Sequence, residues 1–244
     1  MLKRVIISLA LCLQWPAHSS EVVIYSGDNY APIIYLDQQH QPQGVLAQAI
    51  QNYQQFSGKK IKFEVTAWHR AYQYALNGKG GVIGLSKTTP RLALFDYSDV
   101  IYENSVNLVV RRGKEFNYRT LSDLKDKVIG VDLGASYGNE VDTAIQQKLF
   151  KVDISTSNTA RLKKLLHGRS DAAVVTNGQV GLDAILQADP ELLAHKNEFV
   201  TLPVPLVRDA LHLGFAKSMQ MSGFLSEFNQ SLKANKTPFS IKTD

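Results

Sequence analysis

Residues 84–98, GLSKTTPRLALFDYS, form a strand end that passes through a polar turn into a short apolar segment. The turn brings Arg91 close in sequence to the hydroxyl residues Ser86, Thr88 and Thr89. A guanidinium is a planar fork of donors that matches a carboxylate in bidentate fashion, so the pattern suits capture of a small acid. The pattern is equally typical of a solvated arginine after a Thr-Pro turn. The sequence on either side of this stretch is needed to decide between a binding arginine and a solvated one.

Upstream of this stretch, strand and helix patterns alternate. Residues 22–25, 60–65 and 82–85 have the composition of strands, and the first of them ends in a turn cluster followed by Tyr30. Apolar residues recur at helical spacing from Gly44 to Gly58, and again from Trp68 to an Asn-Gly stop. This order predicts an α/β fold, in which ligands bind beyond the carboxyl ends of the strands.

Downstream, a middle block has its own strands. Residues 128–132, 152–155 and 171–176 are strand-like, and the strand-like runs 107–112 and 210–217 flank the whole block. We therefore expect two α/β units, with the chain passing from the first to the second and then back again.

Several motifs in this order resemble the extracellular solute-binding protein family 3, the periplasmic receptors of polar amino acid transporters and their relatives. The resemblance rests on Tyr30-Ala31-Pro32, Gly44 at a helix start, Trp68-x-Arg70-Ala71, Thr88-x-x-Arg91, the run from Leu121 to Val131, Gly134-Ala135-Ser136-Tyr137, Gly168-Arg169-x-Asp171-Ala172, and Leu213-Gly214-Phe215-Ala216-Lys217. Each motif is weak, but together they cover essentially the whole chain after its N-terminal leader.

The resemblance implies a type II periplasmic binding protein fold, with two lobes, a two-strand hinge and a ligand enclosed between the lobes. It places residues 20–108 and 209–244 in lobe 1 and residues 109–208 in lobe 2. Closure of such a hinge excludes water and strengthens the polar contacts inside.

The resemblance also assigns roles to residues in the first lobe. Arg91 corresponds to the arginine that pairs with the ligand's carboxylate, with Thr88 and Ser86 beside it. Tyr30 corresponds to the aromatic residue that covers the ligand, although a core tyrosine would fit the sequence equally well. Trp68 either lines the cleft or packs in the core of an amphipathic helix.

In the second lobe, Ser136 and Tyr137 fall at an expected helix start, where unpaired N–H groups would complement an anion. Ser136 would otherwise act only as a helix cap. Thr176 or Asn177 stands where amino acid receptors carry an aspartate for the ligand's ammonium group. A neutral side chain does not balance a buried ammonium, so the ligand is either a carboxylate without an amino group or an amino acid held through other donors.

The N-terminus has the features of a secretory signal. Two basic residues precede an apolar run of residues 5–13 that is too short to span a bilayer, and Ala17-His18-Ser19 fits a cleavage site. We expect residues 1–19 to be removed on export to the periplasm. Cys12, the one cysteine, lies inside this segment, so the mature chain has no disulfide and no cysteine metal site.

The remaining composition excludes several function classes. Loss of Lys3 and Arg4 lowers the formal net charge from +5 to +3, and the other basic residues are scattered, so nucleic acid is not an expected partner. No motif predicts a metal or cofactor. We expect a monomeric, non-enzymatic receptor for an amino acid or small carboxylate that docks on a transporter permease, or alternatively on a membrane sensor.

A third alternative is an enzyme related to the dehydratases of cyclic acids that share this fold. Acid–base chemistry would need a positioned carboxylate or histidine. Asp28 and Asp132 follow strand ends, where aspartates commonly serve turns, and His69, His167 and His212 form no recognisable spacing with them. This alternative is the weakest of the three.

Overall fold

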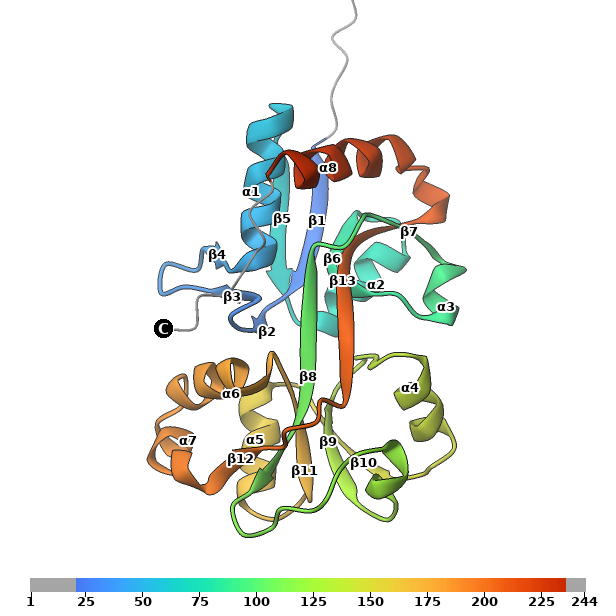
Figure 1. Cartoon of the computed structure of the whole chain (residues 1–244). Helices are drawn as coiled ribbons and strands as arrows, with labels where there is room; N and C mark the ends of the chain where they lie inside the picture. The colour runs from blue at the N-terminus through green and yellow to red at the C-terminus, as the bar shows by residue number, and fades with distance from the viewer. Residues whose placement is uncertain (1–20, 236–244) are drawn as a thin grey trace, which may run out of the picture.

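The computed structural model describes residues 21–235, apart from the side chain of Asn29, and these residues fold into two α/β lobes joined by two long strands (Figure 1). The predicted signal of residues 1–19, including Cys12, lies outside the described residues. Within the described part of the chain, none of the helices has the length and apolar character needed to cross a membrane.

The first lobe has a parallel centre in which β1 pairs with β5 on one side and β6 on the other. Its elements are β1 (Val22–Gly27), β2 (Asn29–Tyr30), β3 (Ile34–Leu36), β4 (Pro42–Gln43), α1 (Val45–Ser57), β5 (Ile61–Thr66), α2 (Trp68–Leu76), β6 (Gly81–Ser86), α3 (Thr89–Leu92), β7 (Phe95–Tyr97), the short 3-10 helix η3 (Lys217–Met219) and α8 (Ser222–Ala234). The predicted strands and helices of this region are confirmed to within a few residues.

The second lobe repeats this plan, with β9 between its parallel neighbours β10 and β11. Its elements are η1 (Leu121–Leu124), β9 (Val128–Asp132), α4 (Asn139–Gln146), β10 (Lys151–Ser155), α5 (Asn158–Leu166), β11 (Ala172–Thr176), α6 (Gly178–Gln187), α7 (Pro190–Ala194), η2 (Lys196–Glu198) and β12 (Phe199–Thr201).

The two connecting strands are β8 (Tyr102–Arg111) and β13 (Val207–Ala216), which run between the upper and lower lobes in Figure 1. Ten residues of strand span roughly 34 Å, enough to enter both lobes. Where they cross, the strands pair antiparallel from Tyr102 opposite Leu211 to Val106 opposite Val207. One continuous sheet path, β10-β9-β11-β8-β13-β6-β1-β5, therefore passes through the hinge. The predicted lobe boundaries, at residues 108/109 and 208/209, fall inside these strands.

Each lobe has its own apolar core. In the first lobe, the C-terminal helix α8 packs on α1, where Phe228 is fully buried and its ring lies 5.5 Å from that of Tyr53. In the second lobe, a separate core gathers around Leu108, Leu124 and Leu202. The chain therefore returns to its first lobe through β13 because α8 is part of that lobe's core.

Gly44 fixes the start of α1. Its φ of 102° lies in the region that favours glycine, and a Cβ there would lie 2.5 Å from the carbonyl oxygens of Pro32 and Ile33. The close backbone approach holds the loop after Tyr30 against the helix start.

Phe228→Ala should destabilise the protein by about 3–5 kcal/mol, because the change leaves a cavity in a fully buried aromatic cluster. Phe56→Ala, on the 46% exposed Phe56 of α1, is the matched control and should change the free energy of unfolding by about 0.5 kcal/mol or less. Urea unfolding measures both. Equal effects of the two substitutions would contradict the described packing of α8.

Candidate ligand-binding cleft between the lobes

A cavity of about 90 Å³ lies between the lobes, bordered by residues of both lobes and of hinge strand β13. This volume is well above the roughly 10–15 Å³ that a single water molecule needs, so the cavity has room for a small polar ligand. Seven of the predicted site residues line it: Tyr30, Trp68, Ser86, Arg91, Ser136, Tyr137 and Thr176. Thr88 and Asn177 are not among the lining residues.

Arg91 is positioned by the turn between β6 and the short helix α3. Its side chain is only 6% exposed, and its guanidinium carbon lies 5.0 Å from the ring centre of Tyr72 and 5.9 Å from that of Trp68. Aromatic faces attract a guanidinium but do not neutralise it. Among residues 21–235, no carboxylate oxygen lies within 4.0 Å of its nitrogens, and the guanidinium makes no hydrogen bond to any group that the structure describes. The solvated-arginine interpretation is therefore wrong, because Arg91 is a buried cation at a cavity.

Asp209 brings a carboxylate to the same cavity from hinge strand β13. Its Oδ2 accepts a hydrogen bond of 2.6 Å from the Ser86 hydroxyl. Burial raises the pKa of the Asp209 carboxyl to about 6, although the Ser86 hydrogen bond and the positive charge of Arg91 act in the opposite direction. Asp209 was not among the predicted site residues, and its only signal in the sequence is an acidic residue directly before the strand-like run 210–217.

Hinge strand β8 ties both lobes together through Asn104, which lies directly opposite Asp209 in the β8–β13 pair. The Asn104 amide donates to the Tyr30 hydroxyl at 2.8 Å and accepts from the Asn177 backbone N–H at 3.0 Å. The Tyr102 hydroxyl donates to the Asn177 side-chain oxygen at 2.8 Å. Burial raises the pKa of Tyr30 well above its ordinary value, so this phenol stays protonated. Asn177 thus contacts the hinge.

In the described part of the chain, two hydrogen bonds cross the cleft. The Trp68 indole N–H donates to the Gly134 carbonyl at 3.2 Å, and the Thr89 backbone N–H donates to the Asn139 side chain at 2.9 Å. Each joins a residue of the first lobe to the loop or helix start after β9. The two lobes are therefore in contact in this structure. Trp68 both lines the cavity and donates one of the hydrogen bonds that hold the lobes together.

The loop after β9 differs from the prediction. Helix α4 begins at Asn139, because Gly138 with a φ of 88° precedes it, whereas the sequence suggested a start at Ser136. The Ser136 hydroxyl donates to Asp142, and the Tyr137 backbone N–H donates to the same carboxylate at 2.9 Å. The backbone donor of Tyr137 is therefore occupied within the lobe.

A second arginine, Arg161, enters the cavity from α5. Its Nε donates to the Val174 carbonyl at 2.9 Å, and its Nη1 lies 3.8 Å from Asp132 Oδ1 without a hydrogen bond to any described residue. Glycine at position 130 leaves room for it, since a Cβ there would lie 3.0 Å from Arg161 Cγ. A sequence signal existed: Arg161 lies four residues before the buried Leu165 and so shares its helix face.

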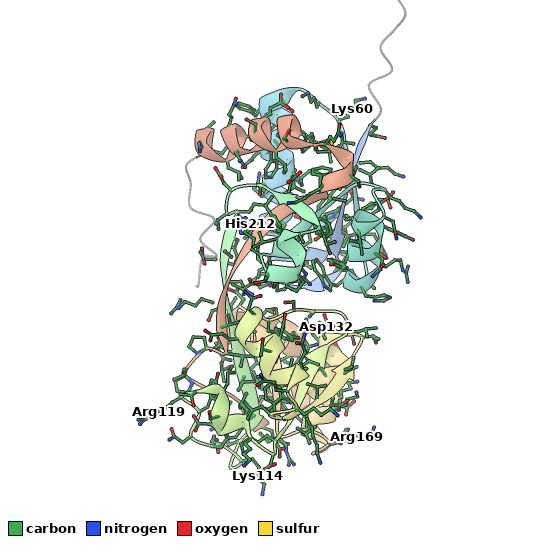
Figure 2. All side chains as sticks on the ribbon, turned by 90° about the vertical axis from the view of Figure 1, so that its right-hand side faces the viewer. Lys60, Lys114, Arg119, Asp132, Arg169 and His212 are labelled. Carbon is green, nitrogen blue, oxygen red and sulfur yellow. The ribbon has the colours of Figure 1, made fainter. Side chains whose placement is uncertain are left out.

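The structure also brings together three residues capable of acid–base chemistry that lie far apart in the sequence. Asp28, His69 and Asp132 all line the cavity, and Figure 2 shows Asp132 on the side of its lobe that faces the other lobe. Burial raises the pKa of Asp132, and Arg161 opposes this shift. His212, by contrast, is buried and bonded to the Ser98 carbonyl at 2.9 Å. Within residues 21–235, no cluster of three or more His, Cys, Asp or Glu side chains could hold a metal ion.

Asp209→Asn should stabilise the ligand-free protein at neutral pH. The fold favours the protonated carboxyl, because the pKa of Asp209 is about 6 in the protein and 3.8 ordinarily, so ionisation costs stability as pH rises through that interval. The charged groups around it are Arg91, which favours ionisation, and Glu103 and Asp142, which oppose it. Melting temperatures without ligand should be higher for the variant above about pH 7 and should converge with wild type near about pH 4. A variant that is less stable at neutral pH would contradict the assignment.

Three solved structures are similar to the chain. A histidine kinase sensor domain with similarity to periplasmic binding proteins has 17% identity and a TM-score of 0.74, with 88% of this chain and 90% of that one covered. An ancestral arginine-binding protein bound to arginine has 21% identity and a TM-score of 0.73, covering 88% and 92%. The holo form of ArgBP from T. maritima has 20% identity and a TM-score of 0.70, covering 90% and 92%.

These similarities show the fold, a two-lobe periplasmic binding protein architecture. Among curated proteins, none matches the chain. The sequence profile of the bacterial extracellular solute-binding proteins, family 3, matches residues 22–237. The chain therefore belongs to the bacterial extracellular solute-binding proteins of family 3.

Proposed function

We propose that the protein captures an amino acid or related small carboxylate between its lobes and delivers it to an ABC transporter. The observation that carries the proposal is the environment of Arg91, a cation 6% exposed at a cavity without a carboxylate partner among residues 21–235. A buried, unpaired charge costs several kcal/mol, and a bound carboxylate offsets that cost. The ligand would therefore stabilise the closed arrangement of the lobes.

The other cleft residues would complete the binding site. Ser86 and Ser136 line the cavity from opposite lobes, and each hydroxyl donates to a carboxylate of the protein here, so each would offer the ligand an oxygen acceptor or exchange its partner on binding. The rings of Tyr30 and Trp68 would cover the apolar part of the ligand, and Thr176 would contact its far end. Thr88 and Asn177 would support the site from behind, since neither is a lining residue.

Delivery to a transporter requires export, and residues 1–19 would serve as the signal to the periplasm. The solved substrate-binding protein of an amino acid ABC transporter, 19% identical with a TM-score of 0.70, supports a transport partner by its architecture. The acid–base residues of the cavity do not lead us to propose an enzyme, because the family is one of solute-binding proteins.

The alternative function is ligand sensing through a membrane signalling protein, which the similarity to a histidine kinase sensor domain favours. Uptake of radiolabelled ligand by cells that lack the protein separates the two functions. Lost uptake supports delivery, whereas unchanged uptake with a lost transcriptional response to the ligand supports sensing.

Arg91→Ala should abolish stabilisation by carboxylate ligands. A ligand at about 100 times its dissociation constant adds roughly 2.7 kcal/mol to stability, so an effective ligand should visibly raise the melting temperature of the wild type. We suggest thermal melts with standard L-amino acids, small carboxylates, amines and sugars as probes.

Arg70→Ala is the matched control, since Arg70 is exposed on α2 of the same lobe and does not line the cavity. It should respond to ligand as the wild type does. The proposal is wrong if no acid stabilises the wild type, or if the Arg91 variant responds to that acid as strongly as the wild type.

A further inference from the structure

The cleft contains two separate opposite charges that are not paired with each other. Arg91 on α3 and Asp209 on β13 both line the cavity, but no nitrogen of Arg91 lies within 4.0 Å of an Asp209 oxygen. A ligand that carries one charge of each sign would give both groups a partner. An α-amino acid has such a pair, with its carboxylate and ammonium groups on the same carbon.

We propose that Asp209 is the counter-ion for the ammonium group of the ligand, so that the cleft selects amino acids over carboxylates that lack an amino group. This inference rests on the proposed function, in which Arg91 holds the carboxylate. The inference also accounts for the missing acid at the end of β11, where Thr176 and Asn177 stand in place of the aspartate expected in an amino acid receptor. In this protein, hinge strand β13 would supply the negative charge instead.

The hydrogen bonds of Asp209 leave it able to bind a cation. Oδ2 accepts from the Ser86 hydroxyl at 2.6 Å, while Oδ1 makes no hydrogen bond to any of the side chains or backbone groups that the structure describes. One hydrogen bond thus orients the carboxylate, and its Oδ1 remains available to accept a hydrogen bond from a ligand. An ammonium group is a donor of three hydrogen bonds and would also offset the cost of ionising this buried acid.

The other carboxylates of the cavity are less suited to this role. Asp132 already accepts from the Leu133 backbone N–H at 3.0 Å and has Arg161 at 3.8 Å, so its charge is balanced inside its own lobe. Asp28 is exposed in the turn after β1. The positive charge that acts on Asp209 is Arg91, and Arg91 has no carboxylate partner among the described residues.

The experiment compares each L-amino acid that stabilises the wild type with the same acid lacking its amino group, by titration calorimetry. For the wild type we expect the amino acid to bind about 30-fold or more tightly than the deaminated acid. Asp209→Asn should weaken binding of the amino acid by about 30-fold or more and leave the deaminated acid nearly unaffected. The Asn side chain keeps an acceptor for Ser86, and melting of the free variant shows that it folds.

Two control variants separate Asp209 from its neighbours. Glu103→Gln removes an exposed carboxylate of the paired hinge strand that does not line the cavity, and Asp28→Asn removes a cavity carboxylate. Both should retain the preference for the amino acid. The inference is overturned if Asp209→Asn keeps that preference, or if Asp28→Asn alone loses it.

The outcomes also distinguish this inference from the proposed function. Binding of deaminated acids that depends on Arg91 but shows no preference for amino acids would retain the receptor function and reject the role of Asp209. Failure of every acid to bind would reject both.

Discussion

The antiparallel pairing of β8 and β13 is the constraint on which the rest of the structure depends. The two strands cross between the lobes side by side, and each continues into the sheet of both. Where they pair, Asn104 and Asp209 lie opposite each other at the cleft. Asn104 holds Tyr30 of one lobe and Asn177 of the other, while Asp209 holds Ser86. The hinge therefore both joins the lobes and supplies part of the binding site.

The electrostatics of the cleft explain why a ligand would favour closure. Among the described residues, two hydrogen bonds cross the cleft, from Trp68 to Gly134 and from Thr89 to Asn139, and each contributes about 1 kcal/mol. Arg91 is buried and Asp209 is partly buried, and neither has an oppositely charged partner within 4.0 Å among the described residues, which costs free energy in the ligand-free protein. A zwitterion would satisfy both charges at once. The same groups that destabilise the empty cleft would thus provide affinity when it is filled.

The sequence predicted the fold well, because apolar periodicity and turn residues are local signals. The strand at residues 128–132, the helix closed by Gly58 and the two crossing runs were all visible in this way. Arg91 was also visible, since its turn motif is contiguous. Asp209 was not visible, because its importance comes from its contact with Ser86 across the fold. Arg161 could be placed on the buried face of its helix, but its contact with Asp132 is also made across the fold and has no local signal. The start of α4 was misplaced because Asp142, six residues on, occupies the donors of Ser136 and Tyr137.

The most direct measurement is a crystal structure grown with the L-amino acid that raises the melting temperature most. The account predicts closed lobes with the ligand's carboxylate within hydrogen-bonding distance of the Arg91 guanidinium. A ligand bound outside the interlobe cavity, or one whose carboxylate points away from Arg91, would contradict it.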